Sequence, residues 1–221
     1  MYAVQRHGIF APCDKSRQSN CRNTGLTFAL LWTGENEMEL RKARKGTYSR
    51  IRTLYLEAFP PAEQAAFHQL IRKAELRRAD MWNLYETDEW VGMAYVLHHN
   101  GLAYIFYLAI DKAQRGKGYG TRAVDAIRRQ YEGCRIFLSL ETPDESADNA
   151  RQRANRHAFY ANCGFQDLPN RVKEGPVIFS LMGTGGSVQA EEYRRLIDHT
   201  LGPTYRQKVG LGFVKEPIGA V

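Results

Sequence analysis

The feature that most constrains this chain is an apolar segment that leads through a glycine-rich turn into a helical pattern. Residues 105–110 are all aliphatic or aromatic, and Arg115-Gly116-Lys117-Gly118-Tyr119-Gly120 follows after a short polar stretch. Because glycine has no Cβ, successive backbone N–H groups can converge on one point, with the positive end of the helix dipole behind them. The order of strand, glycine loop and helix therefore predicts a site for an anion such as phosphate or pyrophosphate.

The spacing of these glycines excludes two common phosphate motifs. A nucleotide P-loop requires Gly-x-x-x-x-Gly-Lys followed by Ser or Thr, and a dinucleotide fingerprint requires Gly-x-Gly-x-x-Gly. Neither pattern occurs in the chain. An ordinary strand-to-helix turn that happens to be rich in glycine is the alternative, so the rest of the chain has to be considered.

Size and charge narrow the class of protein. The chain has 221 residues, enough for one ordinary domain with appendages. Its formal net charge of +7 suits an acidic partner. The basic residues are scattered, which favours a solvated basic surface over a dedicated nucleic-acid groove. No apolar run approaches the roughly 20 residues that span a bilayer, so we expect no membrane partner.

The four cysteines give no sign of a metal site. Cys13, Cys21, Cys134 and Cys163 form no Cys-x-x-Cys pair and have no His at the spacing of metal ligands. We therefore expect no metal, reduced thiols and a cytoplasmic location.

The chain divides into three parts on the hydrophobic pattern. Residues 1–37 show no sustained period, and we expect a poorly ordered extension there, which an upstream misread start would explain, with the domain beginning at Met38. A secretory signal is the weaker alternative, because no Ala-x-Ala cleavage site follows the short apolar patch. Residues 38–182 form the expected domain. Residues 183–221 read as a linker, a helix and a loosely ordered basic tail.

The pattern within residues 38–182 alternates between strands and helices. Strands are expected over residues 38–44, 81–86, 90–98, 102–110, 135–141 and 176–182. Two helices follow the first strand, one follows the glycine loop, and one spans about residues 150–162. Asn100-Gly101 supplies a hairpin turn, because this dipeptide accepts positive φ values. The order predicts an α/β sandwich with a mixed sheet.

Two motifs in this order resemble the GNAT superfamily of N-acetyltransferases. Arg115 to Gly120 is similar to the family's Arg/Gln-x-x-Gly-x-Gly/Ala loop, and Tyr160-Ala161-Asn162-Cys163-Gly164-Phe165 matches a Tyr four residues before Gly-Phe. The resemblance covers about residues 38–182. It implies a GNAT-type α/β sandwich whose mixed, mostly antiparallel sheet is splayed at the acetyl-CoA site. It also implies transfer of an acetyl group from acetyl-CoA to a primary amine of a small molecule or peptide.

The same resemblance implies a set of cofactor contacts made mainly by the backbone. Main-chain groups near the end of strand 102–110 would hydrogen-bond pantetheine, and the amides of the glycine loop would hold the pyrophosphate. The sequence has Arg153 where many family members carry an Asn. The residues expected to bind acetyl-CoA are Leu108, Ile110, Arg115, Gly116, Lys117, Gly118, Tyr119, Gly120, Thr121 and Arg153.

Two residues are the candidates for proton transfer. Tyr160 is the expected general acid, and on a helix it shares a face with Arg153 and Arg156. Its alternative role is an aromatic side chain packed on the sheet. Glu141, at the carboxyl end of strand 135–141, is the expected base, acting directly or through water. Its alternative is a solvated strand-end carboxylate, because the loop that follows is acidic throughout.

Three functions remain open at this point. An N-acetyltransferase is the first, and a non-catalytic acyl-CoA-binding module is the second, because strand 102–110 lacks the carboxylate that some family members carry there. A basic nucleic-acid-binding domain is the third, although no aromatic and basic platform supports it. The helix with Tyr193, Leu196 and Ile197 would dock on the domain or on a second copy, forming a homodimer.

Overall fold

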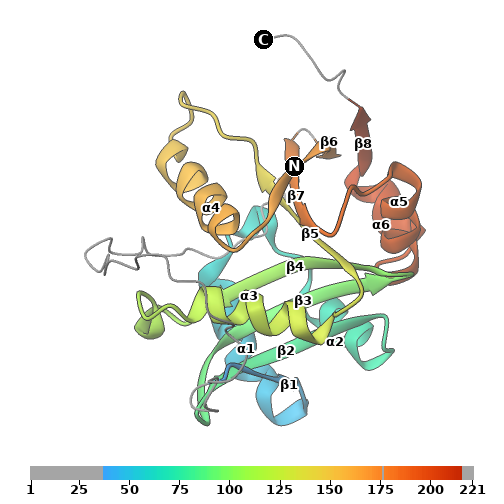
Figure 1. Ribbon diagram of the computed structural model, residues 1–221. Helices are drawn as coiled ribbons and strands as arrows, with labels where there is room; N and C mark the ends of the chain where they lie inside the picture. Colours follow the sequence, from blue (N-terminus) through green and yellow to red (C-terminus); the bar gives the residue numbers. More distant parts are fainter. Residues whose placement is uncertain (1–36, 176, 216–221) are drawn as a thin grey trace, which may run out of the picture.

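The computed structural model describes residues 37–175 and 177–215, which form one open, mixed sheet covered by helices (Figure 1). The strand order is β1-β2-β3-β4-β5-β7-β6-β8. The strands are β1 (Glu39–Lys42), β2 (Ala79–Glu86), β3 (Glu89–His99), β4 (Leu102–Ile110), β5 (Arg135–Glu141), β6 (Gln166–Glu174), β7 (Val177–Thr184) and β8 (Gly212–Lys215). The expectation of an extension and a misread start falls on residues 1–36, outside the described residues.

Six α-helices and three short 3-10 turns connect these strands. The helices are α1 (Tyr48–Ala58), α2 (Phe67–Glu75), α3 (Tyr119–Gln130), α4 (Ala150–Asn162), α5 (Ala190–Thr200) and α6 (Pro203–Val209), and the 3-10 turns are η1 (Lys45–Thr47), η2 (Pro61–Glu63) and η3 (Lys112–Gln114). Among the described residues, none of these helices combines the length and the apolarity that crossing a membrane would require.

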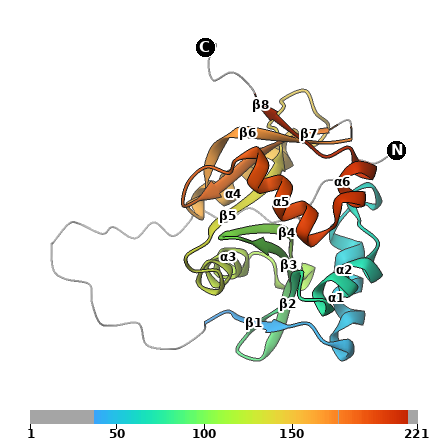
Figure 2. The same ribbon diagram turned by 90° about the vertical axis from the view of Figure 1, so that its right-hand side faces the viewer.

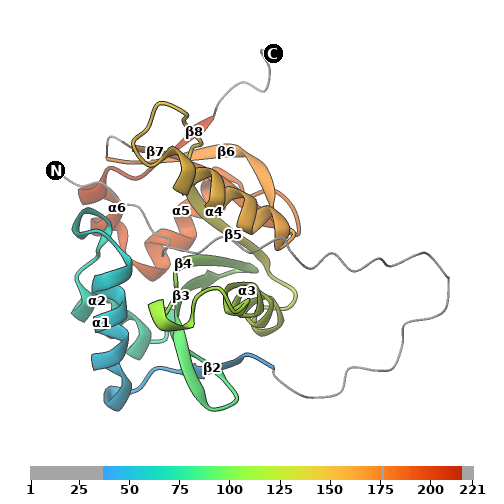
Figure 3. The same ribbon diagram turned by 90° about the vertical axis from the view of Figure 1, so that its left-hand side faces the viewer.

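The helices form a layer on each face of the sheet. Figure 2 shows α3 and α4 on one side and α1, α2, α5 and α6 on the other, and Figure 3 shows the same division from the opposite side. The buried residues fall into two matching clusters. One contains Ala123, Val124 and Ile127 from α3, and the other contains Leu196 and Ile197 from α5. The sheet is therefore buried on both faces, which explains why β4 is apolar along its whole length.

β4 and β5 run parallel but stay together only at their beginnings. The three paired positions are Leu102 with Arg135, Ala103 with Ile136 and Tyr104 with Phe137. Immediately afterwards, the register of β4 against β3 shifts so that Phe106 becomes the extra residue of a β-bulge. A bulge bends a strand and increases its twist. From this point the two strands diverge (Figure 1), and the expected splay of the sheet is confirmed.

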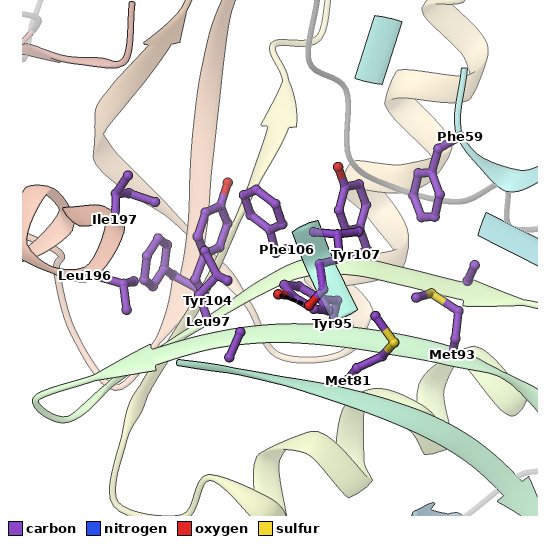
Figure 4. Packing of buried hydrophobic residues seen from close by; sticks show 14 of the residues in the cluster. Phe59, Met81, Met93, Tyr95, Leu97, Tyr104, Phe106, Tyr107, Leu196 and Ile197 are labelled. Carbon is purple, nitrogen blue, oxygen red and sulfur yellow. Dashed lines mark hydrogen bonds between the residues drawn. The ribbon is translucent and has the colours of Figure 1, made fainter. Parts of the chain in front are cut away.

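Aromatic side chains fill the core beneath the bulge (Figure 4). The Tyr107 hydroxyl donates to the Glu63 carbonyl over 2.9 Å and accepts a hydrogen bond from the Ala65 amide over 3.1 Å. The Tyr55 hydroxyl donates to the Ala65 carbonyl over 3.0 Å. These hydrogen bonds fasten the connection between α1 and α2 to the part of β4 that has left β5.

The C-terminal segment contributes more to the fold than the sequence predicted. The strand β6 was not expected, because its sequence is largely polar and contains Pro169, and its register against β7 shifts between Asp167 and Arg171. The expected loose tail is wrong for residues 203–215, since α6 and β8 form there and β8 pairs with β6. The side chain of Tyr193 in α5 lies against the rings of Tyr104 and Phe137, so this helix docks on the sheet of its own chain.

A buried carboxylate links the first strands of the sheet to the end of α3. Asp80 accepts hydrogen bonds from the Tyr131 hydroxyl at 2.6 Å and from Lys42, and the His98 Nε2 atom lies 3.2 Å from its carboxylate. Burial by itself would raise the pKa of Asp80, but the bonds from His98, Lys42 and Tyr131 outweigh it and lower the pKa below its ordinary value.

Replacing Asp80 by Asn is therefore expected to lower the free energy of unfolding by about 2 kcal/mol at pH 7, because charge-assisted hydrogen bonds are lost. Since the folded-state pKa lies below an unfolded value of about 3.9, the ionised carboxylate stabilises the fold above about pH 4 and loses this effect below it. Urea unfolding of both proteins between pH 3 and 7 should show a shallower acid decline for the variant. Asp88→Asn is the control, because this side chain is 84% exposed and its ion pair with Arg41 should contribute little.

Candidate active site

The glycine loop joins the end of β4 to the start of α3 with two left-handed residues. Gly116 has φ 80° and Gly118 has φ 78°, and Gly118 is the N-cap of α3. A Cβ placed on either glycine would meet nothing within 4 Å. Glycine is needed here for its backbone conformation and not to relieve crowding within the chain.

The loop presents a row of unused backbone donors. No side chain caps the N-terminus of α3. None of the hydrogen bonds found in the described part of the chain uses the amides of residues 116–121 as donors. Free amides at a helix N-terminus, together with the helix dipole, form a site for an anion.

Two arginines hold this loop from the sides. The Arg115 Nε donates to the Ile110 carbonyl over 3.1 Å, which ties the loop back to the end of β4. Arg122 donates to the Lys117 carbonyl over 3.2 Å and forms an ion pair with Glu86. The arginine side chains therefore brace the loop, and its amides are the groups left to bind an anion.

Beyond Tyr104, the main chain of β4 has no ladder partner on the side that faces β5. Leu108 pairs with Ala94 and Ile110 pairs with Gly92, both on β3, but β5 offers no ladder partner to either residue. Gly92 is required at this position, because a Cβ there would lie 2.3 Å from the Ala109 carbonyl oxygen. Both residues expected to contact pantetheine thus lie beyond the last pair between β4 and β5.

On the other side of the splay, a charged cluster joins the end of β5 to the first turns of α4. Glu141 forms ion pairs with Arg153 at 2.9 Å and Arg156 at 2.6 Å, and it accepts a hydrogen bond from Asn149 over 3.0 Å. Arg153 also donates to the Thr142 carbonyl over 3.1 Å. The Glu141 side chain is only 9% exposed, so it is not the solvated carboxylate of the alternative interpretation.

Tyr160 follows this cluster by one turn of α4 and is fully buried. Its ring contacts those of Phe159 and Phe165, with centroids 4.9 and 5.7 Å away. Burial raises the pKa of the Tyr160 phenol well above its ordinary value, Cys163 adds to this, and the guanidinium of Arg156 opposes it. The phenol therefore keeps its proton at neutral pH, as a general acid must.

The residues singled out from the sequence fall into two groups, one on each side of the splay. Leu108 to Thr121 belong to β4, the loop and α3, whereas Glu141, Arg153 and Tyr160 belong to β5 and α4. The acidic residues Asp144, Glu145 and Asp148 lie in an exposed turn. Among the described residues, no group of three or more His, Cys, Asp or Glu side chains is arranged to hold a metal ion.

Sequence reasoning missed a pair of hydroxyl groups at the point where the strands part. The Tyr104 and Ser139 hydroxyls are 2.6 Å apart and buried, and the Tyr104 ring stacks on Phe137 with centroids 4.6 Å apart. Tyr104 belongs to the last ladder pair between β4 and β5, so this contact joins the two strands where they begin to part. A polar residue in an otherwise apolar strand was the only sequence signal for Ser139.

Comparison with protein families gives one match that covers this whole region. The model of the Acetyltransferase (GNAT) family matches residues 48–165, which is more than half of the chain. This range contains the glycine loop, the splayed strands and Tyr160. No curated protein sequence matches the chain.

Solved structures share the fold at low sequence identity. A protein from Bacteroides thetaiotaomicron, described as a GNAT-family acetyltransferase, has a TM-score of 0.60 and 22% identity over 78% of this chain and 98% of its own. An aminoglycoside 6'-N-acetyltransferase in complex with coenzyme A has a TM-score of 0.53 and 14% identity over 66% and 96%. The ribosomal-protein-S18-alanine N-acetyltransferase from Escherichia coli has a TM-score of 0.52 and 16% identity over 70% and 97%.

Proposed function

The chain belongs to the GNAT acetyltransferase family, and we propose that it transfers an acetyl group from acetyl-CoA to a primary amine of a small molecule or peptide. The proposal rests on two features that occur together. The backbone amides of residues 116–121 donate no hydrogen bond that was found in the described part of the chain, and the end of β4 has no ladder partner on the β5 side. The first suits a pyrophosphate, and the second suits the amide groups of pantetheine.

The amine is proposed as the acceptor on the strength of the structural relatives. The aminoglycoside 6'-N-acetyltransferase acts on a small molecule, and the enzyme from Escherichia coli acts on an alanine of a ribosomal protein. Both are N-acetyltransferases with the fold of this chain. The acidic turn that contains Asp144 and Asp148 lies beside the cluster around Glu141 and would favour a cationic acceptor.

Acetyl-CoA supplies an acetyl thioester to this site. The amides of residues 116–121 would hold its pyrophosphate, and the main chain of Leu108 and Ile110 would orient its pantetheine arm. The neutral amine nitrogen forms the new bond to the acetyl carbon, and the carbon–sulfur bond breaks with its electron pair on sulfur. Tyr160 would donate its proton to that sulfur and later regain one from the protonated product.

Calorimetric titration with acetyl-CoA, followed by an amine screen that detects released thiol, tests the proposal. We expect binding in the micromolar range and thiol release that depends on an added amine. Binding with no thiol release for any amine would indicate the non-catalytic module instead. A protein that binds no acetyl-CoA, but binds nucleic acid with an affinity that falls steeply with salt, would contradict the proposal altogether.

A further inference from the structure

Two guanidinium groups share one carboxylate at the junction of β5 and α4. Arg153 and Arg156 both pair with Glu141, and the three side chains are 21%, 13% and 9% exposed. The exposed carboxylate of Asp144 also acts on Arg153, whereas the ion-pair partner of Arg156 is Glu141. Arg156 lies one helical turn before Tyr160 on the same face of α4.

Tyr160 needs such a charge nearby. Complete burial makes the phenol a weaker acid, and a phenol that holds its proton too firmly cannot protonate a departing thiolate efficiently. A neighbouring cation corrects this, because it stabilises the anionic phenolate that remains after the proton has left. Arg156 is a cation that acts on Tyr160 against the effect of burial, and Glu141 holds its guanidinium in place.

These contacts give Glu141 a role other than that of a base. Both carboxylate oxygens face guanidinium groups, and Asn149 donates to one of them as well. A general base needs an oxygen that is open to the amine, whereas both Glu141 oxygens are already occupied by guanidinium groups. The Glu141 side chain is therefore suited to anchoring the two arginines.

We propose that Arg156 is a positioning residue that keeps positive charge beside the general acid Tyr160, and that Glu141 is its counter-ion and not the base. The inference rests on the proposed acetyltransferase function, since it assigns roles within the same reaction. The network of Glu141, Asn149 and Arg153 holds the first turns of α4 to the end of β5. The ion pair with Glu141 holds the Arg156 guanidinium within this network.

The test compares Arg156→Gln, Arg156→Lys and Glu141→Gln with the unaltered protein, using an amine that supports turnover. Arg156→Gln should lower kcat about 30-fold while KM for acetyl-CoA stays within about 2-fold, and Arg156→Lys should recover most of the loss. Glu141→Gln should lower kcat by less than about 10-fold. The pH at which kcat rises should be the same as in the unaltered protein. Arg151→Gln, an exposed position on the same helix, is the control and should be unchanged.

Three results would overturn the inference. The first is turnover of Arg156→Gln that matches the unaltered protein. The second is an Arg156→Lys protein, folded by its thermal midpoint, that is as impaired as Arg156→Gln. The third is loss of the rising limb of the pH profile in Glu141→Gln, which would make Glu141 the base. Absence of amine-dependent thiol release from the unaltered protein would instead refute the proposed function, so the two failures are distinguishable.

Discussion

Replacing Gly118 by valine is expected to weaken acetyl-CoA binding by at least about 100-fold. Gly118 has φ 78° at the start of α3, a conformation that a β-branched residue adopts only at a cost of several kcal/mol. Relaxation of this strain would turn the amides of the loop away from one another. A side chain would also occupy the space through which a pyrophosphate reaches those amides, and 100-fold corresponds to about 2.7 kcal/mol.

Gly133 provides a matched control at the other end of the same helix. It has φ 82°, and a Cβ there would meet nothing within 4 Å, so Gly133→Val carries the same backbone strain at a distance from the loop. Calorimetric titration should show that Gly133→Val still binds acetyl-CoA, even if its thermal midpoint falls as far as that of Gly118→Val. Equal loss of affinity in the two folded variants would mean that strain, and not the loop, accounts for the effect.

Replacing Tyr160 by phenylalanine is expected to reduce kcat about 100-fold or more, with acetyl-CoA affinity nearly unchanged. General acids contribute about 10²–10⁴-fold to such reactions, and only the hydroxyl is removed. The ring remains to fill the space between Phe159 and Phe165, so the core should stay intact. Steady-state kinetics with a saturating amine, together with calorimetry, would separate turnover from binding.

Tyr48→Phe removes a hydroxyl from the opposite face of the sheet and serves as the control. The Tyr48 hydroxyl donates to Glu75 over 3.3 Å at the protein surface. Tyr48 begins α1, and α1 and α4 cover opposite faces of the sheet (Figure 2). This variant should keep full turnover. If Tyr160→Phe also keeps full turnover, the acid must be another group, and the buried ring of Tyr160 would then serve only the packing of α4 against the sheet.

The elements with regular hydrophobic patterns were predictable, and those without them were not. The boundaries of β4, β5 and α4 agree with the sequence expectation, because continuous apolar strands and a helix followed by Gly164 leave clear signals. β6 has Pro169 and mostly polar residues, and β8 is a short edge strand. Their pairing depends on β7 and on each other, so no local pattern shows them.

In the site, too, the features set by neighbouring residues in the sequence were predictable, and the contacts between distant residues were not. The loop glycines were identified from their spacing, and the structure gives Gly116 and Gly118 the positive φ values that explain the need for glycine. The neighbours of Glu141 were not identified as its partners, because Arg153 and Arg156 reach it only once α4 folds back on β5. The negative charge at the end of β5 and the positive charges on α4 could have suggested ion pairs, but which of them pair depends on their distance in space.

The sequence by itself determined the glycine loop and the order of the central elements, which follow from the freedom of glycine and the periodicity of buried side chains. The family was indicated by the resemblance of two short motifs, and the family comparison shows it. The tertiary structure alone decided where β4 leaves β5, because the bulge at Phe106 is a matter of register between strands. It also decided that Glu141 lies between two guanidinium groups, since electrostatic partners are set by proximity in space and not along the chain.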